Sequence, residues 1–157
     1  MVEKHHKYLV TVKWTGRPTH QNFERDHDIM AEGKSPIKGS SDPAHRGDSS
    51  RWNPEELLVA SLSTCHQLWY LGLCSQAGIV VTEYEDTAEG SMAEDASGAG
   101  QFTSVTLHPK VTISAESDVA KATDLHHTAH KMCFITRSVN FPINNVPTVI
   151  KGSATTV

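Results

Sequence analysis

The sequence predicts an α+β protein in which antiparallel or mixed sheets surround one long central helix. Residues 53–78 have a helical pattern that is apolar on nearly every side, and such a helix must be covered on all sides. The segments around it alternate at period two and include one further helical pattern, unlike a doubly wound sheet. With 157 residues the chain suits one core, so we expect a single domain over residues 1–157.

The central helix has clear start and stop signals. Asn53 is a favourable N-cap, Pro54 suits the first helical position, and Glu56 lies three residues after the cap. Gly78 suits the left-handed conformation that commonly ends a helix. Polar residues interrupt the apolar pattern inside the helix, so we do not expect a membrane span.

The remaining elements are predicted from alternation and turn residues. Residues 1–52 are expected to hold strands at 7–15 and 26–31 and a polar loop at 35–53. Residues 79–157 are expected to hold, in order, a strand at 79–86, a hairpin loop at 87–100, a long strand at 101–115 broken at Pro109, a helix at about 118–137 and a closing strand at 146–156.

The composition is that of an ordinary soluble protein. Hydrophobic residues make up 38% and charged residues 20% of the chain, and the net charge of −4 gives no basic surface for nucleic acid. The N-terminus lacks the apolar core of a signal peptide. The three cysteines are too few for a disulfide framework, so we expect a cytoplasmic protein with free thiols.

Helix geometry limits which cysteines can pair. Cys65 and Cys74 are nine residues apart in the central helix, which places them on opposite faces, so they cannot form a disulfide with each other. Cys74 is interpreted as a small buried apolar residue. Cys65 and Cys133 lie on the two predicted helices and can approach if these helices pack together. The alternative is that both also fill the core.

The segment NPEELLVASLSTCHQL, which follows a Gly/Ser-rich loop with an arginine, resembles the signature of the OsmC/Ohr family of peroxide-detoxifying thiol proteins. In that family Asn-Pro-Glu opens a long central helix, and the reactive cysteine follows ten residues after the glutamate, as Cys65 follows Glu55. The second family cysteine lies near the end of the second helix, as Cys133 does, although Phe134 stands where proline is common. The resemblance implies the OsmC-like fold and an intertwined homodimer with sites at its interface.

The resemblance also implies an enzyme of the oxidative stress response, a cysteine-based peroxidase that confers resistance to organic hydroperoxides. The Cys65 thiolate would attack the peroxide and become a sulfenic acid. Cys133 would condense with it to form a disulfide, and an external dithiol would reduce both cysteines again. No cofactor, metal, nucleic acid or membrane is required by this interpretation.

A thiolate at Cys65 requires a lowered pKa, and a cysteine in the middle of a helix gains little from the helix dipole. The resemblance implies an arginine held by Glu55. Arg46 in the loop before the helix is our first candidate, and Arg17 after the first strand is the alternative. Glu55 lies ~15 Å along the helix from Cys65. It therefore acts on a distant arginine or on a site completed by a second chain.

Two other functions remain open. His126, His130 and Cys133 fall on one face of the second helix, a spacing that suits zinc ligands in a zinc-binding protein or hydrolase. Alternatively, the fold is a non-enzymatic binding module with an apolar pocket for a small ligand, in which the cysteines only pack.

Overall fold

The computed structural model describes residues 2–16 and 22–153. The chain divides into two compact units, Met1–Leu57 and Leu58–Val157. Each unit is described by itself.

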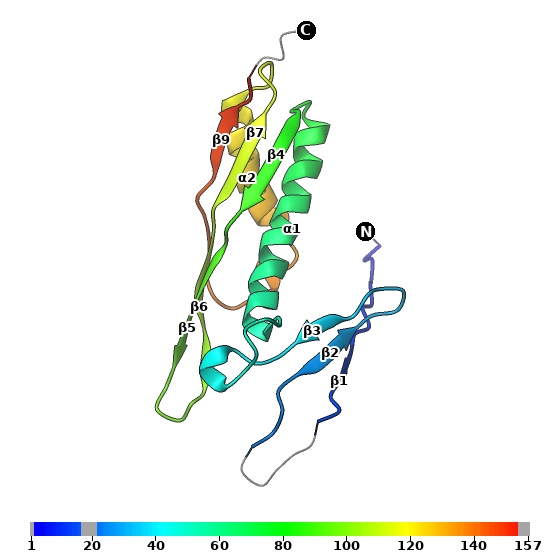
Figure 1. Cartoon of the computed structure of the whole chain (residues 1–157). Helices are drawn as coiled ribbons and strands as arrows, with labels where there is room; N and C mark the ends of the chain where they lie inside the picture. The colour runs from blue at the N-terminus through cyan, green and yellow to red at the C-terminus, as the bar shows by residue number, and fades with distance from the viewer. Residues whose placement is uncertain (1, 17–21, 154–157) are drawn as a thin grey trace. The chain divides into compact units, whose positions relative to one another are not determined.

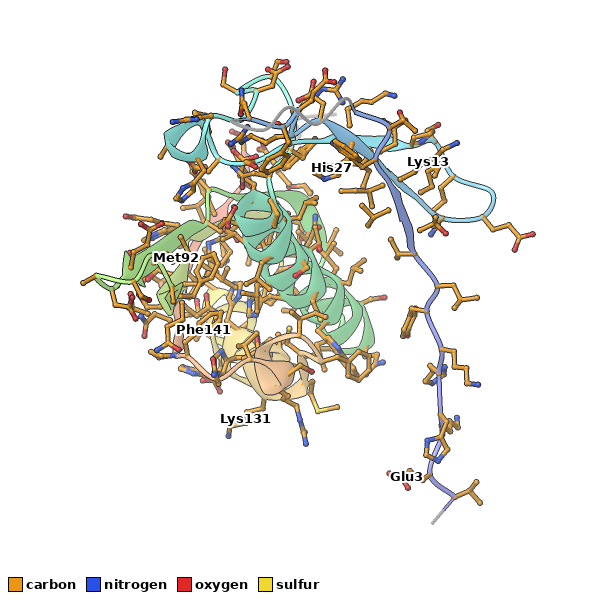
Figure 2. All side chains as sticks on the ribbon, turned by 90° about the horizontal axis from the view of Figure 1, so that it is seen from below. Glu3, Lys13, His27, Met92, Lys131 and Phe141 are labelled. Carbon is orange, nitrogen blue, oxygen red and sulfur yellow. The ribbon has the colours of Figure 1, made fainter. Side chains whose placement is uncertain are left out.

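The first unit is built on a small antiparallel sheet. Its strands β1 (Thr11–Lys13), β2 (His27–Met30) and β3 (Ile37–Gly39) are hydrogen-bonded in that order. The predicted strand at 7–15 is correct in place but too long, although the chain from Glu3 to Lys13 is extended with side chains standing out on both sides (Figure 2). Gly39 pairs with His27, and a Cβ there would lie 2.4 Å from the imidazole Nε2, so only glycine fits.

The predicted loop at 35–53 is more ordered than expected, because it contains β3 and a short 3₁₀ helix, η1 (Pro43–His45). The buried Ser40 organises it: its backbone N–H donates to Trp52 O at 2.9 Å, and its hydroxyl accepts from Asp48 N at 3.0 Å. Pairing with β2, not side-chain alternation, makes Ile37–Gly39 a strand. The alternation pattern therefore could not reveal it.

Helix α1 (Pro54–Gln76) confirms the predicted start and stop. Asn53 Oδ1 accepts from Glu56 N at 2.8 Å, and Glu56 Oε2 accepts from Asn53 N at 3.2 Å, which is a complete capping box. Gly78 has φ of +74° just after the helix. Buried residues recur every fourth position along one face, at Leu62, His66, Tyr70 and Cys74.

The second unit contains two three-stranded mixed sheets, as the predicted fold class requires. One has the order β4 (Val81–Asp86), β7 (Pro109–Ile113), β9 (Thr148–Lys151). The other has the order β5 (Glu89–Glu94), β6 (Gly100–Leu107), β8 (Ile143–Asn145). In each sheet the first two strands pair antiparallel and the last pair is parallel.

Three predicted strand boundaries are wrong. The expected hairpin loop contains β5, whose residues are all exposed and show no apolar alternation. The expected long strand is divided between two sheets at His108, whose N–H donates to Asp86 Oδ1 at 2.7 Å instead of to a ladder. The expected closing strand is preceded by a separate strand, β8, and each of the two joins a different sheet.

Helix α2 (Val119–Met132) is shorter than predicted. Asp118 caps it by accepting from Lys121 N at 3.1 Å. It ends because Cys133 takes an extended conformation, with φ −64° and ψ 114°, and the short 3₁₀ helix η2 (Thr136–Ser138) follows. Within the second unit, α1 and α2 run beside each other next to strands β4, β7 and β9 (Figure 1).

Apolar residues form two clusters along α1. Tyr70 and Cys74 belong to a cluster with β7 and α2, and Leu62 belongs to another with β6. The described part of α1 is covered on one face only, because Leu68 on another face is 70% exposed. By length and composition alone α1 is apolar enough to span a membrane, a test that core helices of soluble proteins also pass.

Candidate functional site

Two cysteines from the two helices meet in the second unit. The Cys65 thiol of α1 lies within hydrogen-bonding reach of the Cys133 thiol at the end of α2. Cys65, Cys74 and Cys133 are all free thiols. The structure thus brings together the two cysteines that the sequence singled out, and leaves Cys74 apart in the apolar core.

Cys133 is held firmly and is shielded from solvent. Its side chain is fully buried, its N–H donates to Ala129 O at 2.9 Å, and its Sγ accepts from Thr136 N at 3.5 Å. Cys65 is only partly buried. Of the two cysteines, Cys65 is therefore the more accessible to a dissolved reactant.

The pKa of Cys65 is raised above its ordinary value. Burial is the main cause, and the neighbouring Cys133 thiol adds to it. The backbone N–H groups of Ile135 and Phe134 lower the pKa of Cys65 in part, because they can hydrogen-bond to the thiolate. No cation contributes to the pKa of Cys65 among the residues that the structure describes.

Phe134 changes the site in a way that the sequence did not predict. Proline, common in the family at this place, has no N–H, whereas Phe134 directs its N–H towards Cys65. The Phe134 ring also meets Trp69 edge to face, with ring centroids 5.5 Å apart. The residue therefore contributes a donor on one side and an aromatic contact on the other.

The predicted activating groups lie in the first unit. Arg46 has a left-handed backbone, with φ of 66°, at the end of η1, and its exposed side chain has no ion pair among the described residues. Glu55 lies in the first turn of α1, and its Oε2 is buried without a hydrogen-bond partner in the described chain. Arg17 falls outside the described residues. The role of these residues at Cys65 stays a prediction.

The zinc alternative fails on geometry. His126 turns into the core, where its Nδ1 lies 3.0 Å from His66 Nε2, so it does not converge with His130 and Cys133. In residues 2–16 and 22–153, no group of three His, Cys, Asp or Glu side chains is placed to hold a metal ion.

Sequence analysis missed a buried polar network. His66 Nε2 lies 3.0 Å from both His126 Nδ1 and Asn145 Nδ2, and His126 stacks on Tyr70 with ring centroids 3.8 Å apart. The signal available in the sequence was the four-residue spacing of Leu62, His66 and Tyr70, which marks His66 as a core position.

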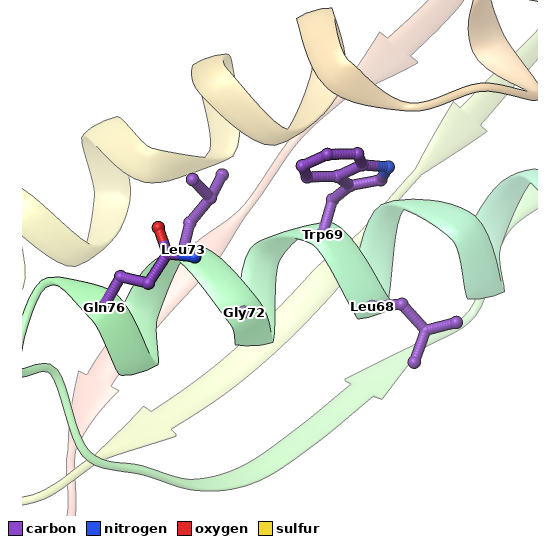
Figure 3. A pocket seen from close by; sticks show the side chains of 5 residues that line it. All are labelled: Leu68, Trp69, Gly72, Leu73 and Gln76. Carbon is purple, nitrogen blue, oxygen red and sulfur yellow. The ribbon is translucent and has the colours of Figure 1, made fainter. Parts of the chain in front are cut away.

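An open apolar groove of about 300 Å³ runs along α1 beyond Cys65. Trp69 and Leu73 point from α1 towards α2, and Leu68 points away from α2 (Figure 3). The groove is lined by Leu68, Trp69, Gly72, Leu73 and Gln76. Since Leu68 and Trp69 lie one turn after Cys65, the groove begins close to the accessible thiol.

The second unit has mixed sheets packed against two helices, and each helix places one thiol beside the other. This arrangement defines a class of thiol-bearing α+β proteins. A family model described as OsmC-like protein matches residues 47–146, which is more than half of the chain. The chain belongs to this OsmC-like family. No curated protein sequence matches it.

Solved structures agree with this assignment. An OsmC-like protein of unknown function from Vibrio cholerae has a TM-score of 0.81 and 28% identity, over 93% of this chain and all of that one. An organic hydroperoxide resistance protein from Elizabethkingia anophelis has a TM-score of 0.66 and 21% identity, over 94% and 99% of the two chains. Another from Bacillus subtilis has a TM-score of 0.57 and 20% identity, over 91% and 98%. The chain therefore shares its fold with proteins named as organic hydroperoxide resistance proteins.

Proposed function

We propose that this protein is a cysteine-based peroxidase that reduces organic hydroperoxides. The observation that carries the proposal is the proximity of a partly exposed cysteine, Cys65, to a fully buried one, Cys133, which raises the pKa of the Cys65 thiol. This asymmetry supports different roles for the two cysteines in the proposed reaction. The peroxide reaches Cys65, and Cys133 reacts only with the oxidised sulfur beside it.

The chemistry has three steps. The Cys65 thiolate attacks one peroxide oxygen, the O–O bond breaks, and the departing alkoxide takes up a proton and leaves as an alcohol. The sulfur, oxidised by two electrons, is now a sulfenic acid. The Cys133 sulfur attacks it, the S–O bond breaks and water leaves. An external dithiol then exchanges with the disulfide and restores both thiols.

Activation of Cys65 needs a cation, because the groups around it in the second unit raise its pKa on balance. We propose that Arg46, or alternatively Arg17, supplies this charge. Glu55 Oε2 is buried and has no hydrogen-bond partner among residues 2–16 and 22–153, which supports an arginine contact, since an unpaired buried carboxylate oxygen is costly.

We propose that the site is completed in a homodimer. Large apolar side chains stand exposed in both units: Tyr8 and Leu9 are 86% and 89% exposed, and Leu68 on α1 is 70% exposed. A second copy would cover such surfaces. It would also allow Glu55 to act at a thiol other than that of its own helix, which lies ~15 Å away.

The apolar groove beside Cys65 supports an organic substituent on the peroxide rather than hydrogen peroxide. The reducing step and the free thiols suit a cytoplasmic protein with an external dithiol as reductant.

A non-enzymatic ligand-binding protein is the second candidate, because the raised pKa of Cys65 suits a structural thiol. Thiol titration and intact mass spectrometry after one equivalent of cumene hydroperoxide distinguish the two. The peroxidase loses two thiols and gains a Cys65–Cys133 disulfide, and Cys65→Ser loses none. Cys74→Ser is the matched control and should react like wild type. Three free thiols at excess peroxide would exclude the peroxidase.

A further inference from the structure

The imidazoles of His66 and His126 form a direct hydrogen bond inside the second unit. His66 Nε2 and His126 Nδ1 are 3.0 Å apart, the ring planes differ by 5°, and the ring centroids are 5.3 Å apart. This centroid separation is what two rings in one plane give when joined edge to edge by a nearly linear N–H···N bond. The rings therefore lie side by side, and their nitrogens point at each other instead of at a common metal position.

Both imidazoles are sealed in the core, with exposures of 0% for His66 and 2% for His126. Burial lowers the pKa of His66 to about 4, helped by His130 and opposed by Asp86. Burial and the neighbouring His66 and His127 lower the pKa of His126 to about 3. Both rings are therefore neutral near pH 7, and the bond joins one N–H to one lone pair.

The outer nitrogens, His66 Nδ1 and His126 Nε2, have no partner among the described residues. Leaving such atoms unpaired in a core is unfavourable, and an apolar pair of similar size would avoid it. The polar pair must therefore provide something that apolar packing would not, and a directional bond fixes relative position more narrowly than apolar contact does.

The hydrogen-bonded chain connects the elements that carry the two reactive thiols. His66 directly follows Cys65 in α1, and His126 lies two turns before Cys133 in α2. Asn145 Nδ2 of β8 also lies 3.0 Å from His66 Nε2, where it shares the single lone pair of that nitrogen with the His126 N–H, and this ties the same point to the sheet. A sliding or rotation of one helix against the other would break this bond and separate the sulfurs.

We propose that His66, His126 and Asn145 are positioning residues that lock α1 and α2 in the register that holds the sulfurs of Cys65 and Cys133 close together. They do not act on the sulfur directly. The side chain of His66 leaves the helix about 100° away from that of Cys65, and its Nε2 is occupied by His126 and Asn145. This proposal depends on the proposed function only because both concern the thiols of Cys65 and Cys133.

The test is a thiol–disulfide equilibrium, which needs no peroxide. In a glutathione buffer, oxidised glutathione takes two electrons from Cys65 and Cys133, leaving the protein disulfide and two reduced glutathiones. The equilibrium constant is the effective concentration of one protein thiol at the other, so it falls when the sulfurs are held apart. For wild type and for each folded variant, the exchange reaction is quenched and the ratio of disulfide to free thiols is determined by peptide mapping.

We expect His126→Leu, which removes the bond but keeps an apolar side chain, to lower this constant at least tenfold. The double variant His66→Gln with His126→Asn should recover it to within about threefold, because the two amides reach the positions of Nε2 and Nδ1. Ser117→Ala is the matched control: it deletes a hydrogen bond of a buried side chain that does not join α1 to α2, from Val80 N to Ser117 Oγ at 3.0 Å. It should lower stability and leave the constant unchanged.

A wild-type constant in His126→Leu would overturn the proposal, as would equal losses in the single and double variants, since packing alone would then explain them. If His126→Leu does not fold, Asn145→Ala decides: we expect at least a threefold loss, and an unchanged constant overturns the proposal. If wild type does not react with peroxide but the variants change the constant as expected, the proposed function is wrong and this inference still holds.

Discussion

The Cys65 thiol lies within hydrogen-bonding reach of the Cys133 thiol, yet of the two only Cys65 is open to solvent. In the proposed cycle, proximity of the two sulfurs would favour their condensation, and burial of Cys133 would shield it from dissolved reactants. This relationship gives the clearest expectations for variants of the protein.

Cys133→Ser should stop the reaction after its first step. Cys65 would still consume one equivalent of cumene hydroperoxide, but its sulfenic acid would persist and be trapped by dimedone, as intact mass spectrometry would show. Wild type, which resolves the sulfenic acid quickly, should give little dimedone adduct. Rapid adduct formation in wild type would mean that Cys133 does not resolve it.

Phe134→Pro should make Cys65 less reactive. The substitution removes an N–H that lowers the pKa of Cys65, so the pKa should rise further and the thiolate fraction at pH 7 should fall. The rate of alkylation by iodoacetamide against pH measures this directly.

Phe134→Leu is the control for the substitution at this position, because it keeps the N–H and loses only the aromatic contact with Trp69. The pKa of Cys65 in this variant should match wild type. If both variants shift it equally, the aromatic ring and not the N–H is responsible.

The protein should lose stability as the pH falls from about 6.5 towards 4.5. The pKa values of His66 and His126 are lowered in the folded state, to about 4 and about 3, so the unfolded chain binds more protons in this window. The loss should be on the order of 4–5 kcal/mol for the two histidines together, somewhat less than two pKa units each at 1.36 kcal/mol per unit. Urea unfolding at pH 7.5, 6.0 and 5.0 measures it.

The double variant His66→Gln with His126→Asn should flatten this dependence, since neither amide titrates. Measurements should stay above pH 4.5, because carboxylates such as Asp48, whose pKa is lowered mainly by its hydrogen bond from the Ser50 side chain, add their own dependence below it. An equally steep loss in the double variant would assign the effect to other groups.

Mixing two inactive variants should restore activity if Arg46 acts on the thiol of a second copy. Arg46→Ala and Cys65→Ser would each be inactive alone. Refolded together at equal amounts, half of the dimers are mixed and each has one intact site, so about a quarter of wild-type peroxidase activity should return. No recovery, with mixed dimers verified by native mass spectrometry, would place arginine and thiol in one chain or exclude Arg46. The same mixture with Arg17→Ala tests the alternative.

The parts of the fold that the sequence predicted are those governed by local interactions. Asn53, Glu56 and Gly78 specify the ends of α1 through hydrogen bonds and backbone conformation within a few residues. The period-two alternation located β4 well, because one of its faces is partly buried. The family motif led to Cys65 and Cys133, which helical spacing alone left as candidates.

The parts that were missed depend on distant partners. β5 has no buried face, so its pairing with β6 leaves no apolar pattern in Glu89–Glu94. The division between β6 and β7 depends on Asp86, which binds His108 N from another strand. The network at His66 needs His126 and Asn145, and no local rule connects residues so far apart in the chain.

In the proposed cycle, the burial of Cys133 would also determine how electrons return to the protein. Once the disulfide had formed, an incoming thiol would attack the more exposed Cys65 sulfur, so Cys133 would be the leaving group and would regain its proton inside the core. Every mixed disulfide with a reductant would therefore form on Cys65. Oxidant and reductant would both react at the Cys65 sulfur. Any molecule bound in the groove beside Trp69 would therefore slow both the oxidation and the reduction of the protein.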